Sequence, residues 1–162
     1  MTTLRVSYVD TLVMRRGARG LELLVLRRGP HGRNPGTWES VHGTIETGEN
    51  PVQAALREVR EETGLEAIAL YNLSRVEGFY RHAADEIALI PAFAALVAAD
   101  GAPALSAEHD ACEWLVPALA AARLTWPRER RALDDLLSIV GGGGAGAGRG
   151  EGGLLDDVLR VS

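Results

Sequence analysis

The chain has 162 residues, 46% of them hydrophobic and 24% charged, a balance that predicts one globular domain with a sizeable core. Its formal net charge of -5 argues against a protein that holds a nucleic-acid backbone by its overall charge. The single cysteine, Cys112, excludes an internal disulfide, and no apolar run approaches the roughly 18 residues of a membrane-spanning helix. Since the N-terminal residues also lack the layout of a signal peptide, we expect a soluble cytoplasmic protein.

Most of the predicted elements are short strands bounded by turn residues. Such runs are predicted at residues 4–14, 21–26, 37–41, 67–79, 87–97 and 113–116. The first two are predicted to pair across the turn RRGARG, and residues 29–36 (GPHGRNPG) are predicted to form a loop. Helices are predicted at 117–124 and 128–140, the second with apolar residues at helical spacing. Strands interrupted by one helix and followed by others predict an α/β (mixed α+β) fold, in which helices cover a mixed sheet.

The composition changes after residue 140. Residues 141–153 read GGGGAGAGRGEGG, which predicts a flexible linker. Residues 154–162 form a short amphipathic segment that is expected to pack on its own domain or on a partner, and a homodimer through this apolar end is one option. We therefore expect the folded domain to comprise residues 1–140.

One further helix is predicted from Pro51 to Thr63. Asn50 can cap its first amides, proline suits the first helical position, and Gly64 suits the end because glycine tolerates a left-handed conformation. Near its end lie three glutamates, Glu58, Glu61 and Glu62. Residues three and four apart are neighbours on a helix surface, so these carboxylates are predicted to cluster.

Such a cluster destabilises the helix unless something compensates its charge. Two carboxylates about 4–5 Å apart near a surface repel by about 3–4 kcal/mol, and these lie at the negative end of the helix dipole. A solvated acidic face paired with Arg57 and Arg60 is one explanation. A bound divalent cation is the other, and carboxylate oxygens suit Mg²⁺ or Mn²⁺. The surroundings favour the cation, since Gly43 permits close approach of the backbone to a ligand and Glu49 can brace Arg57.

Residues 43–65, GTIETGENPVQAALREVREETGL, resemble the motif of the Nudix hydrolases. The fixed positions of that motif are all present, as Gly43, Glu49, Arg57-Glu58-Val59, Glu61-Glu62 and Gly64-Leu65. The resemblance implies a mixed β-sheet between helices, with this motif as a loop–helix–loop. It also implies hydrolysis of a nucleoside diphosphate linked to another moiety, X. By the same resemblance, Glu58, Glu61 and Glu62 bind the metal, the Gly43 carbonyl is a further ligand, and Glu49 and Arg57 support them.

A wider similarity lies outside the motif. TWESVHGTIETGE, SAEHDACEWL and LTWPRERRAL are similar to segments of bacterial Nudix pyrophosphohydrolases that act on dATP and dihydroneopterin triphosphate. This similarity implies that Glu108 is a metal ligand or the general base. Glu113, Glu86 and the glutamates of the motif remain alternatives for the base.

The substrate contacts are less specified. Arg27, Arg28 and Arg33 are predicted to meet phosphates, with solvated arginines as the alternative, and Trp38 and Tyr80 are predicted to stack on a base, with core packing as the alternative. A (deoxy)nucleoside triphosphate or pterin triphosphate is the expected substrate, while dinucleoside polyphosphates and nucleotide sugars stay open. A non-catalytic nucleotide-binding module on the same scaffold is the competing hypothesis.

Overall fold

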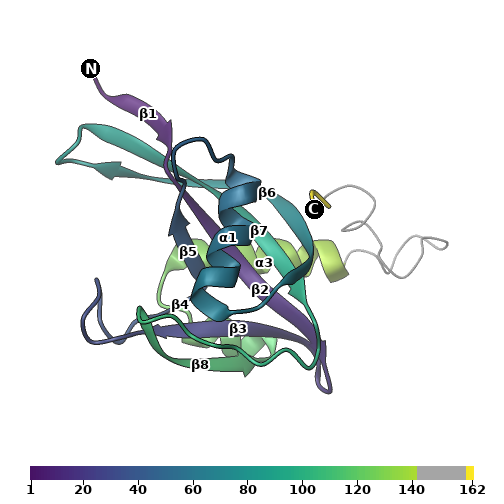
Figure 1. The fold of residues 1–162 in the computed structure, drawn as a ribbon. Coiled ribbons are helices and arrows are strands. Elements are labelled where there is room, and N and C mark those ends of the chain that lie inside the picture. Colours follow the sequence, from purple (N-terminus) through teal and green to yellow (C-terminus); the bar gives the residue numbers. More distant parts are fainter. Residues whose placement is uncertain (142–159) are drawn as a thin grey trace.

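The computed structural model describes residues 1–141 and 160–162. In these residues eight strands form one mixed sheet and three helices cover it (Figure 1). The elements in chain order are β1 (Thr3–Val6), β2 (Tyr8–Gly17), β3 (Gly20–Arg28), β4 (Trp38–Glu39), β5 (Val41–Thr44), α1 (Pro51–Thr63), β6 (Ala67–Arg81), β7 (Glu86–Val97), β8 (His109–Leu115), α2 (Pro117–Arg123) and α3 (Pro127–Gly141). The rest of the predicted linker, residues 142–153, and residues 154–159 of the predicted C-terminal segment lie outside the described residues.

β2 is the central strand of the sheet. It runs parallel to β7 and antiparallel to both β3 and β5. β5 pairs with the first part of β2, which places Gly43 opposite Val9, and β3 pairs with the last part. On one side of β2, β1 and β6 both pair with β7. On the other side, β4 and β8 both pair with β3. The strand that carries Gly43 therefore lies in the middle of the molecule, beside β2.

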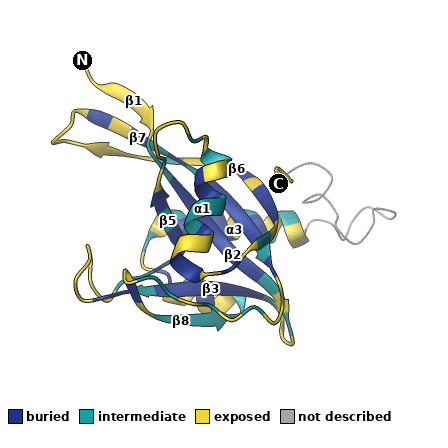
Figure 2. Ribbon diagram, in the orientation of Figure 1, coloured by how far each residue is buried: buried dark blue, intermediate teal, exposed yellow. Residues whose placement is uncertain are grey.

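The helices lie on opposite faces of the sheet, α1 on one and α3 on the other (Figure 1). On the α1 face, Ala54, Ala55 and Val59 are buried against strand residues such as Val9. On the other face, residues of α2 and α3 pack on a second core that includes Leu12. Figure 2 shows buried residues along the middle of the sheet under α1, with the exposed residues of β1 at the periphery. The predicted mixed fold, a sheet between helices, is confirmed.

The ends of the helices and strands show which of them local sequence predicted correctly. The predicted helix 51–63 is confirmed at both ends. The predicted strand 4–14 is instead two strands that meet at Ser7, because each pairs in parallel with a different part of β7. The strand predicted at 113–116 begins at His109, since its antiparallel pairing with β3 continues to that residue. In α3, Leu133 and Leu136 are buried as the spacing indicated, but Val140 is 41% exposed.

The last three residues return to the sheet. Arg160 forms an antiparallel bridge with Tyr71. The Leu70 amide donates to the Ser162 carbonyl at 2.7 Å, and the Val161 amide donates to the Leu70 carbonyl at 2.8 Å. These residues therefore pack on β6 of their own domain. Among the described residues, no helix combines the length and apolar character needed to cross a membrane.

Candidate active site

Helix α1 is fixed at both ends. The Asn50 side chain accepts a hydrogen bond from the Gln53 amide at 2.9 Å, and the Gln53 side chain accepts one from the Asn50 amide at 2.9 Å, which is a reciprocal cap. Gly64 ends the helix in a left-handed conformation (φ 67), and its amide donates to the Arg60 carbonyl at 2.8 Å. These caps set where the helix begins and ends, and so they position its last-turn glutamates against the sheet.

Strand β5 approaches α1 so closely that a side chain at residue 43 would displace Glu58. A Cβ atom there would lie 1.9 Å from Cδ and 2.1 Å from Cγ of Glu58, whereas carbon atoms in contact are normally about 3.5–4.0 Å apart. The backbone of Gly43 and the carboxylate of Glu58 are therefore direct neighbours. The sequence predicted a close approach of the Gly43 backbone to a ligand, and the close approach in the structure is to a side chain of the motif itself.

Arg57 binds three glutamates and one carbonyl. Its Nε and Nη2 donate to the two carboxylate oxygens of Glu49 at 2.7 and 2.9 Å, and Nη2 also donates to the Thr44 carbonyl at 2.8 Å. Its Nη1 donates to Glu58 at 2.8 Å and to Glu61 at 3.0 Å. This pairing lowers the pKa of Glu49 to about 2 and raises the pKa of Arg57 above its ordinary value. Arg57 is thus the predicted brace to Glu49, and it also holds two of the predicted metal ligands.

Glu62 is the buried member of the cluster. It is 3% exposed, and its Oε2 atom has no hydrogen-bond partner within the part of the chain that the structure describes. Burial raises its pKa well above the ordinary value, and repulsion from Glu58, Glu39 and Glu108 raises it further, while Arg28 acts in the opposite direction. A carboxyl group is thus held in the interior among other carboxyl groups, with one oxygen unused.

A second arginine, Arg28, joins β3 to this acidic cluster. Its Nε contacts Glu39 Oε1 at 2.5 Å, and its Nη1 donates to Glu108 at 2.7 Å. Glu39 is also in hydrogen-bond contact with His109 at 3.1 Å. Glu108, named from sequence, therefore lies beside the motif, whereas Glu39 was not singled out by sequence. The signal for Glu39 was weak, because it is a single acid in a short strand whose partners lie far along the chain.

Two other candidates for the general base, Glu113 and Glu86, lie away from the motif. Glu113 accepts a hydrogen bond from Arg123 at 2.9 Å, and Glu86 accepts from Ser7 and Arg81, each at 3.2 Å. Glu108 is among the largest causes that raise the pKa values of both Glu58 and Glu62, whereas neither Glu113 nor Glu86 is. Of these three residues, Glu108 therefore has the strongest electrostatic effect on the motif.

The donor set fits a hard divalent cation. Among the described residues, no three carboxylate or imidazole groups already converge as a metal cage. Arg57 holds Glu58 and Glu61, and Arg28 holds Glu108. Nevertheless the site offers only oxygen ligands, one buried carboxylate oxygen of Glu62 is unpartnered, and the carboxyl groups repel one another. Mg²⁺ and Mn²⁺ prefer oxygen ligands, and a divalent charge would remove the repulsion.

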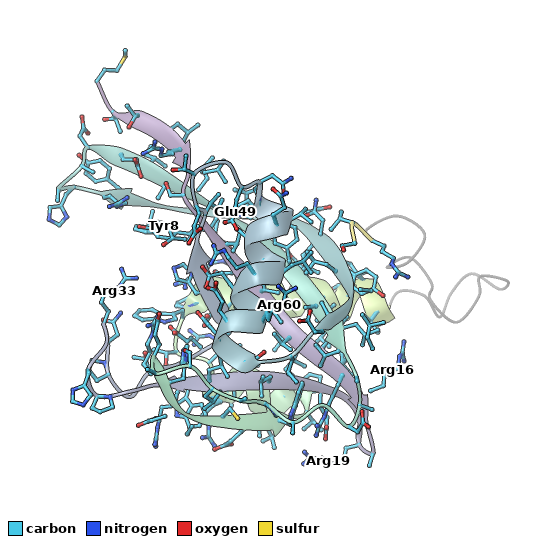
Figure 3. The ribbon with its side chains drawn as sticks, in the orientation of Figure 1. Tyr8, Arg16, Arg19, Arg33, Glu49 and Arg60 are labelled. Atoms are coloured by element: carbon cyan, nitrogen blue, oxygen red, sulfur yellow. The ribbon has the colours of Figure 1, made fainter. Side chains whose placement is uncertain are left out.

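A pocket of about 210 Å³ adjoins the cluster. Its cationic residues are Arg28, Arg33 and Arg128, and its aromatic residues are Phe79 and Trp126. Asn34, Glu39 and His42 complete the lining. Because Arg28 and Glu39 belong both to the pocket and to the acidic cluster, a molecule that fills the pocket lies next to the glutamates of the motif. Figure 3 shows Arg33, in the loop between β3 and β4, on the same side of the molecule as Tyr8.

Two of the five residues predicted to contact the substrate line the pocket, and three do not. Arg28 and Arg33 line the pocket, whereas Arg27, Trp38 and Tyr80 do not. Arg27 instead donates to Asp110 at 2.7 Å and lies over the Trp38 ring at 5.8 Å. The Tyr80 hydroxyl donates to Asp85 at 2.9 Å.

The aromatic residues that do line the pocket are Phe79 and Trp126, and the sequence reasoning missed both. Neighbouring residues of a strand face opposite sides of the sheet, which separates Phe79 from Tyr80. That alternation was the available signal for Phe79, while Trp126 lies in a segment named only for its family resemblance.

With the geometry established, comparison with known proteins identifies the fold as that of the Nudix domain. A family model described as NUDIX domain matches residues 5–136, which is most of the chain, so the chain belongs to the Nudix family. The resemblance to this family drawn from residues 43–65 is confirmed.

Individual relatives extend the comparison. An octanoyltransferase of Myxococcus xanthus is 43% identical over 111 residues, which cover 64% of this chain and 29% of that protein. This chain therefore spans less than a third of that relative's length. The structure is also similar to a C. elegans Ap4A hydrolase in a binary complex (TM-score 0.70, 22% identity, 85% of this chain and 99% of that one). A similar fold occurs in the E. coli dihydroneopterin triphosphate pyrophosphohydrolase (TM-score 0.66, 23% identity, 83% and 96%).

Proposed function

We propose that this Nudix hydrolase catalyses the divalent-metal-dependent hydrolysis of a diphosphate bond in a nucleotide-type substrate, a (deoxy)nucleoside triphosphate or a pterin triphosphate. The observation that carries the proposal is the buried carboxylate of Glu62. Its unpartnered oxygen and its repulsion from Glu58 and Glu108 are unfavourable in a protein that has only to be stable. They suit a site that binds a cation beside a phosphate chain.

The residues divide the work of the reaction. Glu58, Glu61 and Glu62 would hold Mg²⁺ or Mn²⁺, with the Gly43 carbonyl as a further ligand. The bound ion supplies charge neutralisation on the phosphate oxygens and activation of water. Arg57 orients the acids, because its guanidinium is fixed by two bonds to Glu49 and binds Glu58 and Glu61.

Glu108 is the proposed general base, which accepts the proton of the attacking water. Its carboxylate is 60% exposed, so water reaches it, and it is held by Arg28 at 2.7 Å. Arg28 also lines the pocket, where its positive charge can contact a phosphate oxygen while it positions Glu108. A general base needs this combination of access to water and a fixed position.

Two structural relatives bear on the class of substrate, and they favour different phosphate-containing molecules. The dihydroneopterin triphosphate pyrophosphohydrolase favours a triphosphate, and the Ap4A hydrolase keeps a dinucleoside polyphosphate as the alternative. The acyl-transfer activity of the Myxococcus xanthus protein is not carried to this chain, because the match covers 29% of that protein.

The experiment is a panel of nucleotides incubated with Mg²⁺ or Mn²⁺, with the products identified by mass. Glu61→Gln and Glu62→Gln are expected to lower turnover by a factor of about 10² or more. Glu66→Gln is the matched control, because Glu66 is an exposed glutamate just beyond α1 that pairs with Arg60. Full activity in Glu61→Gln or Glu62→Gln would defeat the metal assignment. Ligand-dependent stabilisation without any product would instead favour the non-catalytic binding module.

A further inference from the structure

The pocket beside the acidic cluster is lined by two aromatic side chains, Phe79 and Trp126. Phe79 is 46% exposed although it is a large apolar residue, and it stacks on Tyr8 with ring centroids 5.8 Å apart. Trp126 lines the same pocket, and its Nε1 donates to Glu39 at 3.4 Å. Aromatic side chains in a small pocket offer stacking surfaces for a flat ring system. The volume of about 210 Å³ is below the range of roughly 300–1,000 Å³ that holds drug-sized ligands, so it suits one heterocycle.

The hydrogen-bonding groups of the pocket are mainly donors. Arg128 is held by Asp10, with Nε donating to Oδ2 at 2.6 Å and Nη2 donating to Oδ1 at 3.5 Å. Its Nη1 has no hydrogen-bond partner among the described residues. Asp10 therefore fixes this guanidinium while leaving donor capacity for a ligand. Arg33 adds a second guanidinium that has no hydrogen bond or ion pair in the described part of the chain.

The one carboxylate of the pocket, Glu39, is already occupied. Its Oε1 contacts Arg28 and His109, and its Oε2 accepts from Trp126. Glu39 is also 4% exposed, so it has little capacity left to accept a hydrogen bond from an exocyclic amine. The side chain of Asn34 carries both a donor and an acceptor and does not decide between ligands.

From these contacts we infer that the pocket receives a planar heterocycle that presents a ring carbonyl beside a ring nitrogen, as 6-oxopurines and pterins do, in preference to a 6-aminopurine. The pair of acceptors matches the two parallel donors of a guanidinium, while an exocyclic amine would face a donor instead. The inference deepens the proposed function, on which it rests for the position of the phosphate chain. The preference for the heterocycle belongs to the pocket and is measured without hydrolysis.

The test uses the full chain in buffer with a chelator and no divalent metal. Inosine and adenosine monophosphates, which differ at the 6-position of the purine, are titrated by calorimetry and by quenching of tryptophan fluorescence. One well-made bidentate contact discriminates by about 1–3 kcal/mol, so the Kd for inosine monophosphate is expected to be at least about tenfold lower. Trp126→Phe is expected to abolish most of the quenching while calorimetry still detects binding.

Arg33→Ala and Arg16→Ala form a matched pair, because both arginines have no side-chain partner in the described residues. Figure 3 shows Arg16 far from Arg33, near the turn that joins β2 to β3. Arg33→Ala is expected to reduce the preference for inosine monophosphate at least about threefold, and Arg16→Ala is expected to leave it unchanged.

Four results would overturn the inference. The first is equal affinity for the two nucleotides or a preference for adenosine monophosphate, and the second is no saturable binding of either nucleotide at millimolar concentration. The third is fluorescence quenching in Trp126→Phe as large as in the unmodified chain. The fourth is the same preference for inosine monophosphate in Arg33→Ala and Arg16→Ala. A chain that prefers inosine monophosphate and hydrolyses nothing refutes the proposed function alone. A chain that hydrolyses nucleotides without this preference refutes the pocket assignment alone.

Discussion

Replacement of Gly43 by alanine tests the architecture of the site directly. The new Cβ would lie 1.9 Å from Cδ and 2.1 Å from Oε1 of Glu58, which is about 1.5–2 Å too close. Since the Glu58 side chain can rotate and the β5 backbone is held by its pairing with β2, the carboxylate is expected to move. A displacement of about 1 Å in a catalytic group can cost about 10² in rate. Gly43→Ala is therefore expected to lower kcat/KM at least about 10²-fold.

Gly17→Ala is the matched control for this variant. A Cβ at residue 17 would lie 2.2 Å from Oε2 of Glu22, so the same kind of clash with a glutamate arises in a strand. Glu22 pairs with Arg15 and Arg19 and has no contact with the motif. A side chain forced off its rotamer costs about 0.5–1.5 kcal/mol, so each variant is expected to lower Tm by about 1–6 °C.

The assay combines melting curves, metal titration by calorimetry and turnover at saturating metal. Similar losses of Tm in both variants, with loss of turnover and metal affinity in Gly43→Ala alone, are expected. The reasoning is refuted if Gly43→Ala keeps full turnover and metal affinity. It is also refuted if Gly17→Ala loses as much activity, since stability would then explain both.

Three further outcomes follow from the charges of the site. Burial and neighbouring acids raise the pKa of Glu62, so its ionisation destabilises the metal-free fold as pH rises above the ordinary glutamate range. Glu62→Gln is therefore expected to raise Tm at pH 8 by about 2 °C or more while activity falls. An unchanged or lower Tm contradicts this. Because Arg57 lowers the pKa of Glu49 to about 2, their pair contributes stability that is lost as pH falls from about 4.5 to about 2. Arg57→Met is expected to remove that part of the pH dependence of Tm. A curve of Tm against pH that Arg57→Met leaves unaltered contradicts this. Glu108→Gln is expected to lower kcat by about 10²–10⁴ and Glu113→Gln to leave it near wild type, as measured by product release; equal effects would argue against Glu108 as the base.

The parts of the fold that sequence predicted well depend on local interactions. Helix α1 was placed at both ends because its signals, Asn50, Pro51 and Gly64, act within one turn of the chain. The strand break at Ser7 could not be placed in this way. It depends on β7, whose residue Leu89 accepts the Ser7 amide hydrogen bond at 3.2 Å. Such long-range pairing leaves little trace in the residues on either side of the break.

The same distinction applies to the site. The spacing of the motif was enough to group Glu58, Glu61 and Glu62, because one helix carries all three. The pocket depends on separate elements meeting, so sequence named Tyr80 where Phe79 lines it. Alternation along β6 assigns these two residues to opposite faces, but it does not say which face meets β2. In the structure Phe79 stacks on Tyr8, the first residue of β2, so Phe79 is on the face that meets β2.

The arrangement of arginines around the acids favours a binding site over a solvated acidic surface. Arg57 and Arg28 between them pair with Glu49, Glu58, Glu61, Glu39 and Glu108. The carboxylate that neither arginine pairs with is that of Glu62, which is the most buried of the three predicted metal ligands and has one buried oxygen without a partner in the described residues. Replacing a buried charged group by a packed apolar one is often neutral or stabilising, so stability alone does not account for a glutamate at residue 62. A cation that reaches this oxygen would bind the carboxylate of the cluster that Arg28 and Arg57 leave unpaired.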